Sequence, residues 1–119
     1  MRLLFLCVGN TCRSQMAEAV AKQMGHEAQS AGTNPGSVVA QDAIKVNGEI
    51  GIDMSGQYPK SVDDIDTTGF DRIISMGCGV DCPALSMDDD WGLEDPVGPS
   101  ESFYRKTLEQ IKQRLIALD

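Results

Sequence analysis

The sequence predicts an α/β fold of three layers, a four-stranded parallel sheet with helices on both faces, in one domain over residues 1–119. Short apolar runs at 2–7, 72–76 and 84–87 have the length of strands, and residues 29–31 are a further candidate for a short strand. Segments with helical spacing follow at 14–25, 38–47 and from 101. Strands that alternate with helices favour a parallel sheet covered on both faces. A chain of 119 residues suffices for one core but is short for two.

Each predicted helix carries apolar side chains at spacings of three or four residues, which is typical of a helix that packs through one face. In the first helix these are Met16, Val20 and Met24. In the second they are Val39, Ala43 and Val46. In the last they are Tyr104, Leu108, Ile111, Leu115 and Leu118. Glu18 and Lys22 stand four residues apart, so we expect them to form an ion pair on the first helix.

Two polar stretches separate the predicted elements. Residues 32–36, with two glycines and a proline, predict a turn. Residues 56–69 contain Asp63, Asp64 and Asp66, and we interpret this acidic run as a solvated surface rather than a metal site.

Charge and hydropathy exclude several classes of partner. The net charge of −8 argues against nucleic acid and anionic membranes, since both need a basic face. No apolar stretch approaches the length of a membrane span, and the start of the chain lacks the features of a signal peptide. We therefore expect a cytoplasmic protein.

The most informative motif is a cysteine and an arginine that enclose five residues between the first strand and the first helix. A loop in this position directs backbone N–H groups, a helix N-terminus and the Arg13 guanidinium at one point, where a tetrahedral oxyanion can bind. The same positive environment stabilises the thiolate of Cys7, the reactive form of cysteine. We therefore predict that Cys7 is a nucleophile beside an anion site. The predicted anion-binding residues are Val8, Gly9, Asn10, Thr11, Cys12, Arg13 and Ser14.

The residue types within this loop suit that geometry. Gly9 can take positive φ and Asn10 tolerates the left-handed region, so the loop can curl tightly. The planar fork of Arg13 matches two oxygens of a tetrahedral anion. Ser14 can cap backbone amides of the helix or donate to the Cys7 sulfur.

Four cysteines in a cytoplasmic chain indicate redox or metal chemistry before structural disulfides. Because carboxyl ends of parallel strands meet at one edge of a sheet, the segment with Cys78 and Cys82 can approach Cys7. A zinc site of Cys7, Cys12, Cys78 and Cys82 is disfavoured by their spacing and by the neighbouring Arg13. In the redox interpretation Cys78 and Cys82 form a local disulfide, and Cys12 packs beneath the loop.

The chain resembles the thioredoxin-coupled arsenate reductases, which are built on the low-molecular-weight protein tyrosine phosphatase fold. The resemblance is carried by residues 7–18, 30–32 and 91–96 and by the pair Cys78 and Cys82. Two features favour the reductases over the phosphatases. Gln15 stands where the phosphatases typically have proline, and the extra cysteine pair has no use in ester hydrolysis.

The resemblance implies a mechanism. Cys7 attacks arsenate held by the loop amides and Arg13, and Asp95 protonates the departing oxygen as general acid. Cys78 then attacks the Cys7 adduct, which releases arsenite, and Cys82 moves the disulfide to Cys78–Cys82 for reduction by thioredoxin. Phosphate and sulfate are expected to compete with arsenate, and no bound cofactor is required.

The chain also departs from that family. The spacing of Cys78 and Cys82 is shorter than in the reductases compared. Asn10, Glu18 and Ser30 match side-chain positions of a potassium site in the family, whereas Lys60 stands near the place of an acidic ligand in some members. Potassium binding therefore stays open, and no other metal is expected.

Two alternatives remain. A phosphatase acting on phosphotyrosine or small phosphate esters would use the same Cys7, Arg13 and Asp95. A non-enzymatic oxyanion-binding or redox-sensing module would use Cys78 and Cys82 to report oxidation.

Overall fold

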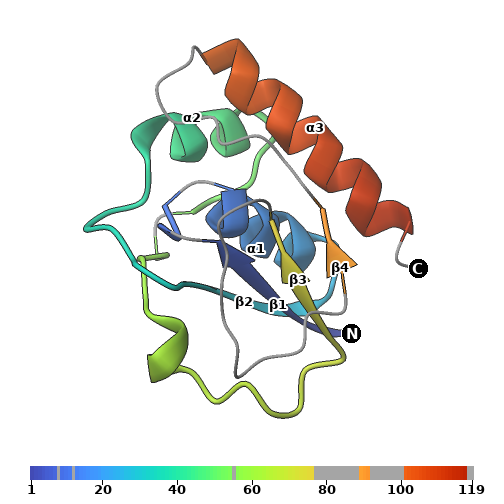
Figure 1. Ribbon diagram of the computed structural model, residues 1–119. Coiled ribbons are helices and arrows are strands. Elements are labelled where there is room, and N and C mark those ends of the chain that lie inside the picture. Colours follow the sequence, from blue (N-terminus) through green and yellow to red (C-terminus); the bar gives the residue numbers. More distant parts are fainter. Residues whose placement is uncertain (8, 12, 55, 77–88, 92–100, 118–119) are drawn as a thin grey trace.

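The computed structural model describes residues 1–7, 9–11, 13–54, 56–76, 89–91 and 101–117 (Figure 1). In chain order the elements are β1 (Arg2–Cys7), α1 (Arg13–Gln23), β2 (Glu27–Gly32), α2 (Gln41–Glu49), the 3-10 helix η1 (Val62–Asp64), β3 (Arg72–Ser75), β4 (Asp89–Asp90) and α3 (Glu101–Ala117). The strands lie in the order β2-β1-β3-β4, and each neighbouring pair is parallel. The predicted α/β fold with a parallel sheet is confirmed.

Strand β1 lies in the middle of the sheet, and it is buried on both faces. Its residues alternate between two cores, because successive side chains of a strand point to opposite faces. Leu3, Phe5 and Cys7 belong to the larger core, and Leu4 and Leu6 belong to the smaller one. A strand enclosed in this way is a continuous apolar run, which is why its position is readable from the sequence.

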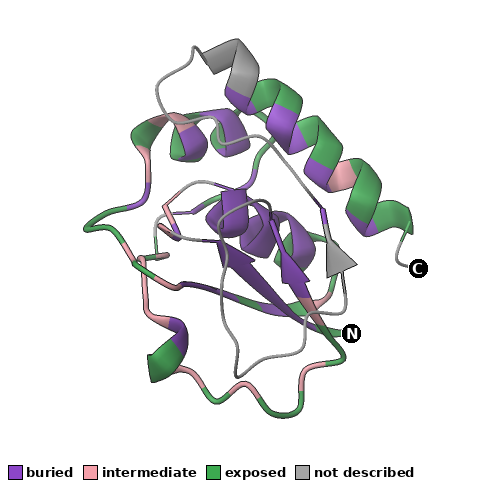
Figure 2. Cartoon of the chain, in the orientation of Figure 1, coloured by how far each residue is buried: buried purple, intermediate pink, exposed green. Residues whose placement is uncertain are grey.

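The larger core lies between the sheet and the three α-helices, and Figure 2 shows α1 and β1 almost wholly buried at its centre. Helix α1 packs on β1 and β2, and α3 packs on α1 and α2. The ring of Phe5 lies 5.6 Å from that of Trp91, so the residue after β4 also joins this core. Together these contacts fix the first turn of α1 above the carboxyl end of β1.

The second face of the sheet differs from the prediction of a helical layer. Its core of Leu4, Leu6, Ala31 and Val62 is covered, in the described residues, by the coil around the single-turn helix η1. Ile65 and Phe70 of this coil pack against that core and are partly buried, as is Ile73 of the strand Arg72–Ser75. These apolar residues have no helical spacing, and Asp63, Asp64 and Asp66 between them are exposed as expected.

Several element boundaries also differ from those predicted. Helix α1 ends at Gln23, before Gly25 with its positive φ of 95°, so Met24 is exposed rather than buried. Strand β2 is longer than the predicted 29–31, because it pairs with β1 along its whole length. Helix α2 begins at Gln41 rather than at 38. The predicted strand at 84–87 lies outside the described residues.

Helix α3 follows its predicted pattern closely. Tyr104, Leu108, Ile111 and Leu115 are buried, and Leu118 lies outside the described residues. Arg105 binds both carboxylate oxygens of Glu49, at 2.8 and 2.6 Å, and so joins α3 to α2. The hydrogen bond from Arg105 lowers the pKa of Glu49.

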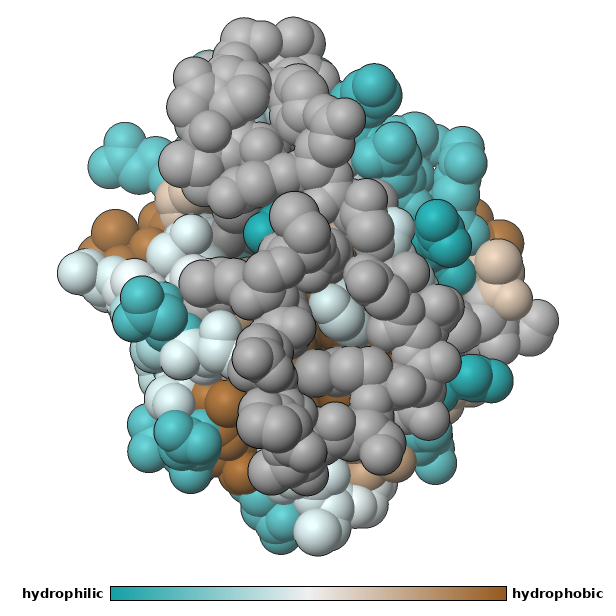
Figure 3. Space-filling model, viewed as in Figure 1, coloured by the Kyte–Doolittle hydropathy of each residue, from teal (hydrophilic) through white to brown (hydrophobic). Residues whose placement is uncertain are grey.

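In the part of the chain that the structure describes, no helix is long and apolar enough to cross a membrane. On the face shown in Figure 3, hydrophilic residues of the described chain lie around the periphery. The exposed large apolar side chains come from separate elements, and scattered residues of this kind are normal.

The burial of α3 gives a stability prediction. We expect Ile111→Ala to lower the free energy of unfolding by about 2–5 kcal/mol, since it leaves a cavity in the larger core. The matched control Ile116→Ala, whose side chain is 62% exposed, should cost no more than about 0.5 kcal/mol. Urea denaturation measures both, and equal losses would contradict the packing described here.

Candidate active site

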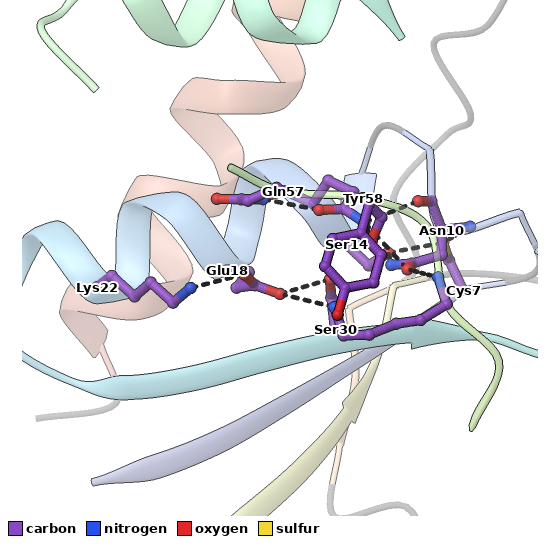
Figure 4. Close-up of polar contacts among 10 residues, drawn as sticks. Cys7, Asn10, Ser14, Glu18, Lys22, Ser30, Gln57 and Tyr58 are labelled. Atoms are coloured by element: carbon purple, nitrogen blue, oxygen red, sulfur yellow. Dashed lines mark hydrogen bonds and ion pairs between the residues drawn. The ribbon is translucent and has the colours of Figure 1, made fainter. Parts of the chain in front are cut away.

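The sulfur of Cys7 receives polar contacts from two directions at the carboxyl end of β1 (Figure 4). The backbone N–H of Asn10 donates to Cys7 Sγ at 3.0 Å, and Ser14 Oγ lies 2.9 Å from the same sulfur. The amide of Asn10 donates to Ser14 Oγ at 2.7 Å, which leaves the hydroxyl hydrogen of Ser14 to point at the sulfur. Two donors at such distances stabilise a thiolate, so the predicted role of Ser14 toward Cys7 fits the geometry.

Asn10 is the residue that turns the loop. Its φ of 52° places it in the left-handed region, which Asn adopts more readily than other residues with a side chain. Of the two residues expected to let the loop curl, Asn10 is the one for which the structure gives a positive φ. Because Asn10 turns the chain, its own N–H points back to Cys7.

Every polar group of the fully buried Asn10 is used. Its side-chain oxygen accepts from the backbone N–H of Lys60 at 2.9 Å and from Gln15 Nε2 at 3.0 Å. Its backbone oxygen accepts from the same Gln15 nitrogen at 3.0 Å. These bonds hold a conformation that isolated Asn seldom adopts.

The segment that follows β2 forms backbone hydrogen bonds with the loop between β1 and α1. Thr33 donates its N–H to Cys7 O, Gly36 to Gly9 O and Ala40 to Thr11 O. Gly36 permits this approach, because a Cβ there would lie 2.8 Å from the methyl carbon of Thr11. The predicted turn at 32–36 therefore supports the loop between β1 and α1.

Arg13 is the first residue of α1 and is 5% exposed, and Ser14 follows it, fully buried. Both stand at the end of the helix where backbone N–H groups have no partner within the helix and where the helix dipole is positive. A thiolate and a tetrahedral anion are the species that such a place stabilises. The arrangement suits nucleophilic attack by sulfur on an oxyanion.

A second polar cluster lies one turn further along α1. Glu18 is buried, and its two oxygens take different partners. Lys22 Nζ lies 2.8 Å from Oε2, which confirms the predicted ion pair, and Ser30 Oγ donates to Oε1 at 2.8 Å. Lys60 Nζ lies 3.5 Å from Oε1.

This cluster does not fit a potassium ion. The set implied by the resemblance comprises Asn10, Glu18 and Ser30, but the ammonium of Lys60 already neutralises Glu18 Oε1 and would repel a second cation there. The side-chain oxygen of Asn10 is also occupied by two donors. Among the described residues, no three His, Cys, Asp or Glu side chains are grouped to hold a metal.

An open groove of about 1190 Å³ lies among the described residues, and its lining does not include Cys7. It runs between α1 and the residues from 51 to 69, and its wall includes Glu18, Lys22, Gln57, Tyr58 and Lys60. The groove therefore touches the outer side of the residues that hold the loop.

Five predicted site residues lie outside the described residues: Val8, Cys12, Cys78, Cys82 and Asp95. The described chain nevertheless fixes where two of these segments start. Met76 donates its N–H to Leu6 O at 2.8 Å, and Trp91 donates to Ser75 O at 2.8 Å. Both anchors lie at the edge of the sheet where Cys7 stands, as predicted for the carboxyl ends of parallel strands.

Sequence reasoning did not identify the residues that hold the loop from behind. Gly36 and the backbone of Lys60 contact the loop only through tertiary structure, and Gln57 contacts Gln15, which in turn bonds Asn10. Gln15 was singled out only as a replacement for proline. The one available signal was the glycine in the predicted turn at 32–36.

The chain is similar to known proteins along nearly its whole length. Residues 2–119 match the family model described as low molecular weight phosphotyrosine protein phosphatase. A protein of Synechocystis sp. named glutaredoxin arsenate reductase is 38% identical, over 96% of this chain and 92% of its own. A solved structure described as an arsenate reductase in the phosphate binding state has a TM-score of 0.90 at 37% identity, covering 98% of this chain and 95% of that one.

The description of a third relative includes its reductant. The structure of a thioredoxin-dependent arsenate reductase of Corynebacterium glutamicum has a TM-score of 0.80 at 31% identity, covering 98% of this chain and 59% of that one. The chain belongs to the low molecular weight phosphotyrosine protein phosphatase family. Within that family, the relatives just described carry the name arsenate reductase.

The Glu18 cluster gives a prediction that distinguishes stabilisation by the Lys60 ammonium from stabilisation by a bound potassium ion. Lys60→Met should lower the free energy of unfolding by about 1–2 kcal/mol, because the buried carboxylate then keeps only one ammonium. The control Lys112→Met removes a pair with an exposed partner, Glu109, and should cost no more than about 0.5 kcal/mol.

The wild-type protein should have the same Tm in KCl and NaCl at equal ionic strength. A rise in Tm that is specific to potassium would contradict our description of the cluster.

Proposed function

We propose that this protein reduces arsenate to arsenite with the thiolate of Cys7 as nucleophile. The observation that carries the proposal is the placement of Cys7 Sγ, with Asn10 N–H and Ser14 Oγ as donors, beside the first turn of α1. Arsenate and phosphate are both tetrahedral oxyanions, so one loop can bind either. The names of the relatives favour arsenate.

The first step is the attack of Cys7 sulfur on arsenic. The remaining N–H groups of loop 8–14 and the guanidinium of Arg13 hold the arsenate oxygens. One oxygen departs as water, after proton transfer from Asp95, and a bond forms between sulfur and arsenic. Asp95 is four residues after the anchored Trp91, so the chain can place it at most about 14 Å from that residue.

The second step transfers two electrons to arsenic. Cys78 thiolate attacks Cys7 sulfur, the bond from sulfur to arsenic breaks, and its electron pair leaves with arsenic as arsenite. A Cys7–Cys78 disulfide results. Cys78 follows Met76 by two residues, or at most about 7 Å, and Met76 is bonded to the strand that carries Cys7. Cys82 then attacks Cys78, which restores the Cys7 thiolate and leaves a Cys78–Cys82 disulfide.

An external dithiol protein completes the cycle by reducing that disulfide. We propose thioredoxin, because a relative at 31% identity is thioredoxin-dependent. The relative at 38% identity carries glutaredoxin in its name, so glutaredoxin is a necessary second arm of the test. Thiols that cycle in this way need a reducing compartment, which supports a cytoplasmic location.

Phosphate ester hydrolysis is the second candidate, because the family is described by that activity. The same Cys7 and Arg13 would serve it, and water would release the phosphate from sulfur. It would not use Cys78 and Cys82.

The cysteine variants separate the two reactions. We expect Cys82→Ser to perform one turnover of arsenate and to stop as a Cys7–Cys78 disulfide, because no thiol remains to release Cys7. Cys78→Ser should not form arsenite. The readouts are arsenate-dependent NADPH oxidation with thioredoxin and thioredoxin reductase, or with glutaredoxin, glutathione and glutathione reductase, and mass spectrometry of the trapped species.

Hydrolysis of a chromogenic aryl phosphate is the control, and any such activity should survive both substitutions. Multiple turnovers by either variant would exclude the relay. Aryl phosphate hydrolysis without arsenate reduction in the wild type would establish the phosphatase instead.

A further inference from the structure

We propose that Gln15 is a positioning residue for the nucleophile, which acts through Asn10 and is itself oriented by Gln57. The three side chains form a continuous path from the groove to the Cys7 sulfur. This inference deepens the proposed function, because it concerns the same thiolate. It does not depend on which oxyanion the loop binds.

The path begins at Gln57, which lies in the groove wall. Its side-chain nitrogen donates to Gln15 Oε1 at 2.7 Å and to Gln15 O at 2.9 Å. With the oxygen of the Gln15 amide held by Gln57, the nitrogen of that amide must face the opposite way. Figure 4 shows Gln57 on one side of α1 and the contacts of Asn10 and Cys7 at the other end of this network.

The nitrogen of Gln15 then meets three oxygens. It lies 3.0 Å from both Asn10 O and Asn10 Oδ1, and 2.9 Å from Tyr58 O. An amide nitrogen has two hydrogens, so all of its donor capacity is used. The reversed amide would set an oxygen against three oxygens, so the buried side chain has only one favourable orientation.

The side-chain nitrogen of Gln15 therefore donates to both the backbone oxygen and the side-chain oxygen of Asn10. These are the bonds that can hold a left-handed Asn, a conformation that costs about 1–2 kcal/mol in a residue with a side chain. Once Asn10 is held, its N–H points at Cys7 Sγ and its amide orients Ser14. Together with the backbone N–H of Lys60, Gln15 thus supports both donors to the sulfur without touching it.

The test measures the reactivity of Cys7 rather than turnover. Gln15→Met keeps the length of the side chain and its fit in a helix but removes all of its hydrogen bonds. We expect iodoacetamide to alkylate Cys7 about tenfold more slowly at neutral pH, the size expected when a hydrogen bond to a charged group is lost. The rate is read by tandem mass spectrometry of the tryptic peptide 3–13, which separates Cys7 from Cys12.

A merely structural role would change this rate in the opposite direction. Loosening the fold would expose the buried Cys7 and would not slow its alkylation. The matched control is Gln23→Met, an exposed glutamine at the end of the same helix, which should leave the rate unchanged. Thermal unfolding of each variant shows whether it is folded.

Gln57→Met supplies the second variant. It should slow alkylation in the same direction by about threefold, because Gln15 loses the partner that orients it. It should have no further effect when combined with Gln15→Met, since the two act along one path. If Gln15→Met does not fold, the alkylation rate of Cys7 in Gln57→Met tests the proposal: slower alkylation supports it, and an unchanged or faster rate overturns it.

A folded Gln15→Met protein with unchanged or faster alkylation of Cys7 would overturn the proposal, and so would fully additive effects of the two substitutions. If the wild type fails to reduce arsenate while these rates follow the expectation, the proposed function fails and the role of Gln15 stands.

Discussion

The site depends on one buried asparagine in the left-handed conformation. Asn10 turns the loop between β1 and α1, and its N–H and its amide direct two donors to Cys7. A buried polar residue is stable only when its groups are bonded, and all those of Asn10 have partners. The conformation that makes Cys7 a plausible nucleophile therefore requires Gln15 and the backbone of Lys60 to be in place.

The parallel sheet supplies the rest of the arrangement. Because β3 pairs with β1 and β4 pairs with β3, the segments that lead to Cys78 and Asp95 start at the same edge as Cys7. Hydrogen bonds from Met76 and Trp91 fix those starting points. A relay among three cysteines needs such closeness, because each disulfide forms only between sulfurs that can touch.

The ends of the chain were the most predictable part of the fold. β1 and α3 have strong apolar patterns, and the structure has both where they were expected. β4 has no apolar pattern, because it consists of Asp89 and Asp90, so its pairing with β3 could not be predicted from hydropathy. The acidic stretch was correctly assigned to the surface, but its sparse apolar residues gave no indication that the coil covers a face of the sheet.

At the site, too, features encoded by neighbouring residues were predictable, and those that depend on tertiary structure were not. Cys7, Asn10, Arg13 and Ser14 are close in sequence, so local geometry sufficed to predict that they act together. Gly36 meets the loop, and Gln57 meets Gln15, only after the chain has folded, so sequence spacing could not assign either residue to the site. Lys60 was recognised as unusual, but its contact with Glu18 depends on the path of a coil segment.

The central claim is that loop 7–14 binds a tetrahedral anion against a reactive Cys7. The most direct test is to alkylate the wild-type protein with iodoacetamide over a range of inorganic phosphate concentrations, with chloride at matched ionic strength as the control. Saturating phosphate should abolish alkylation of Cys7, because the anion covers the sulfur, while matched chloride leaves the rate unchanged. Alkylation of Cys7 that is indifferent to phosphate would contradict the account.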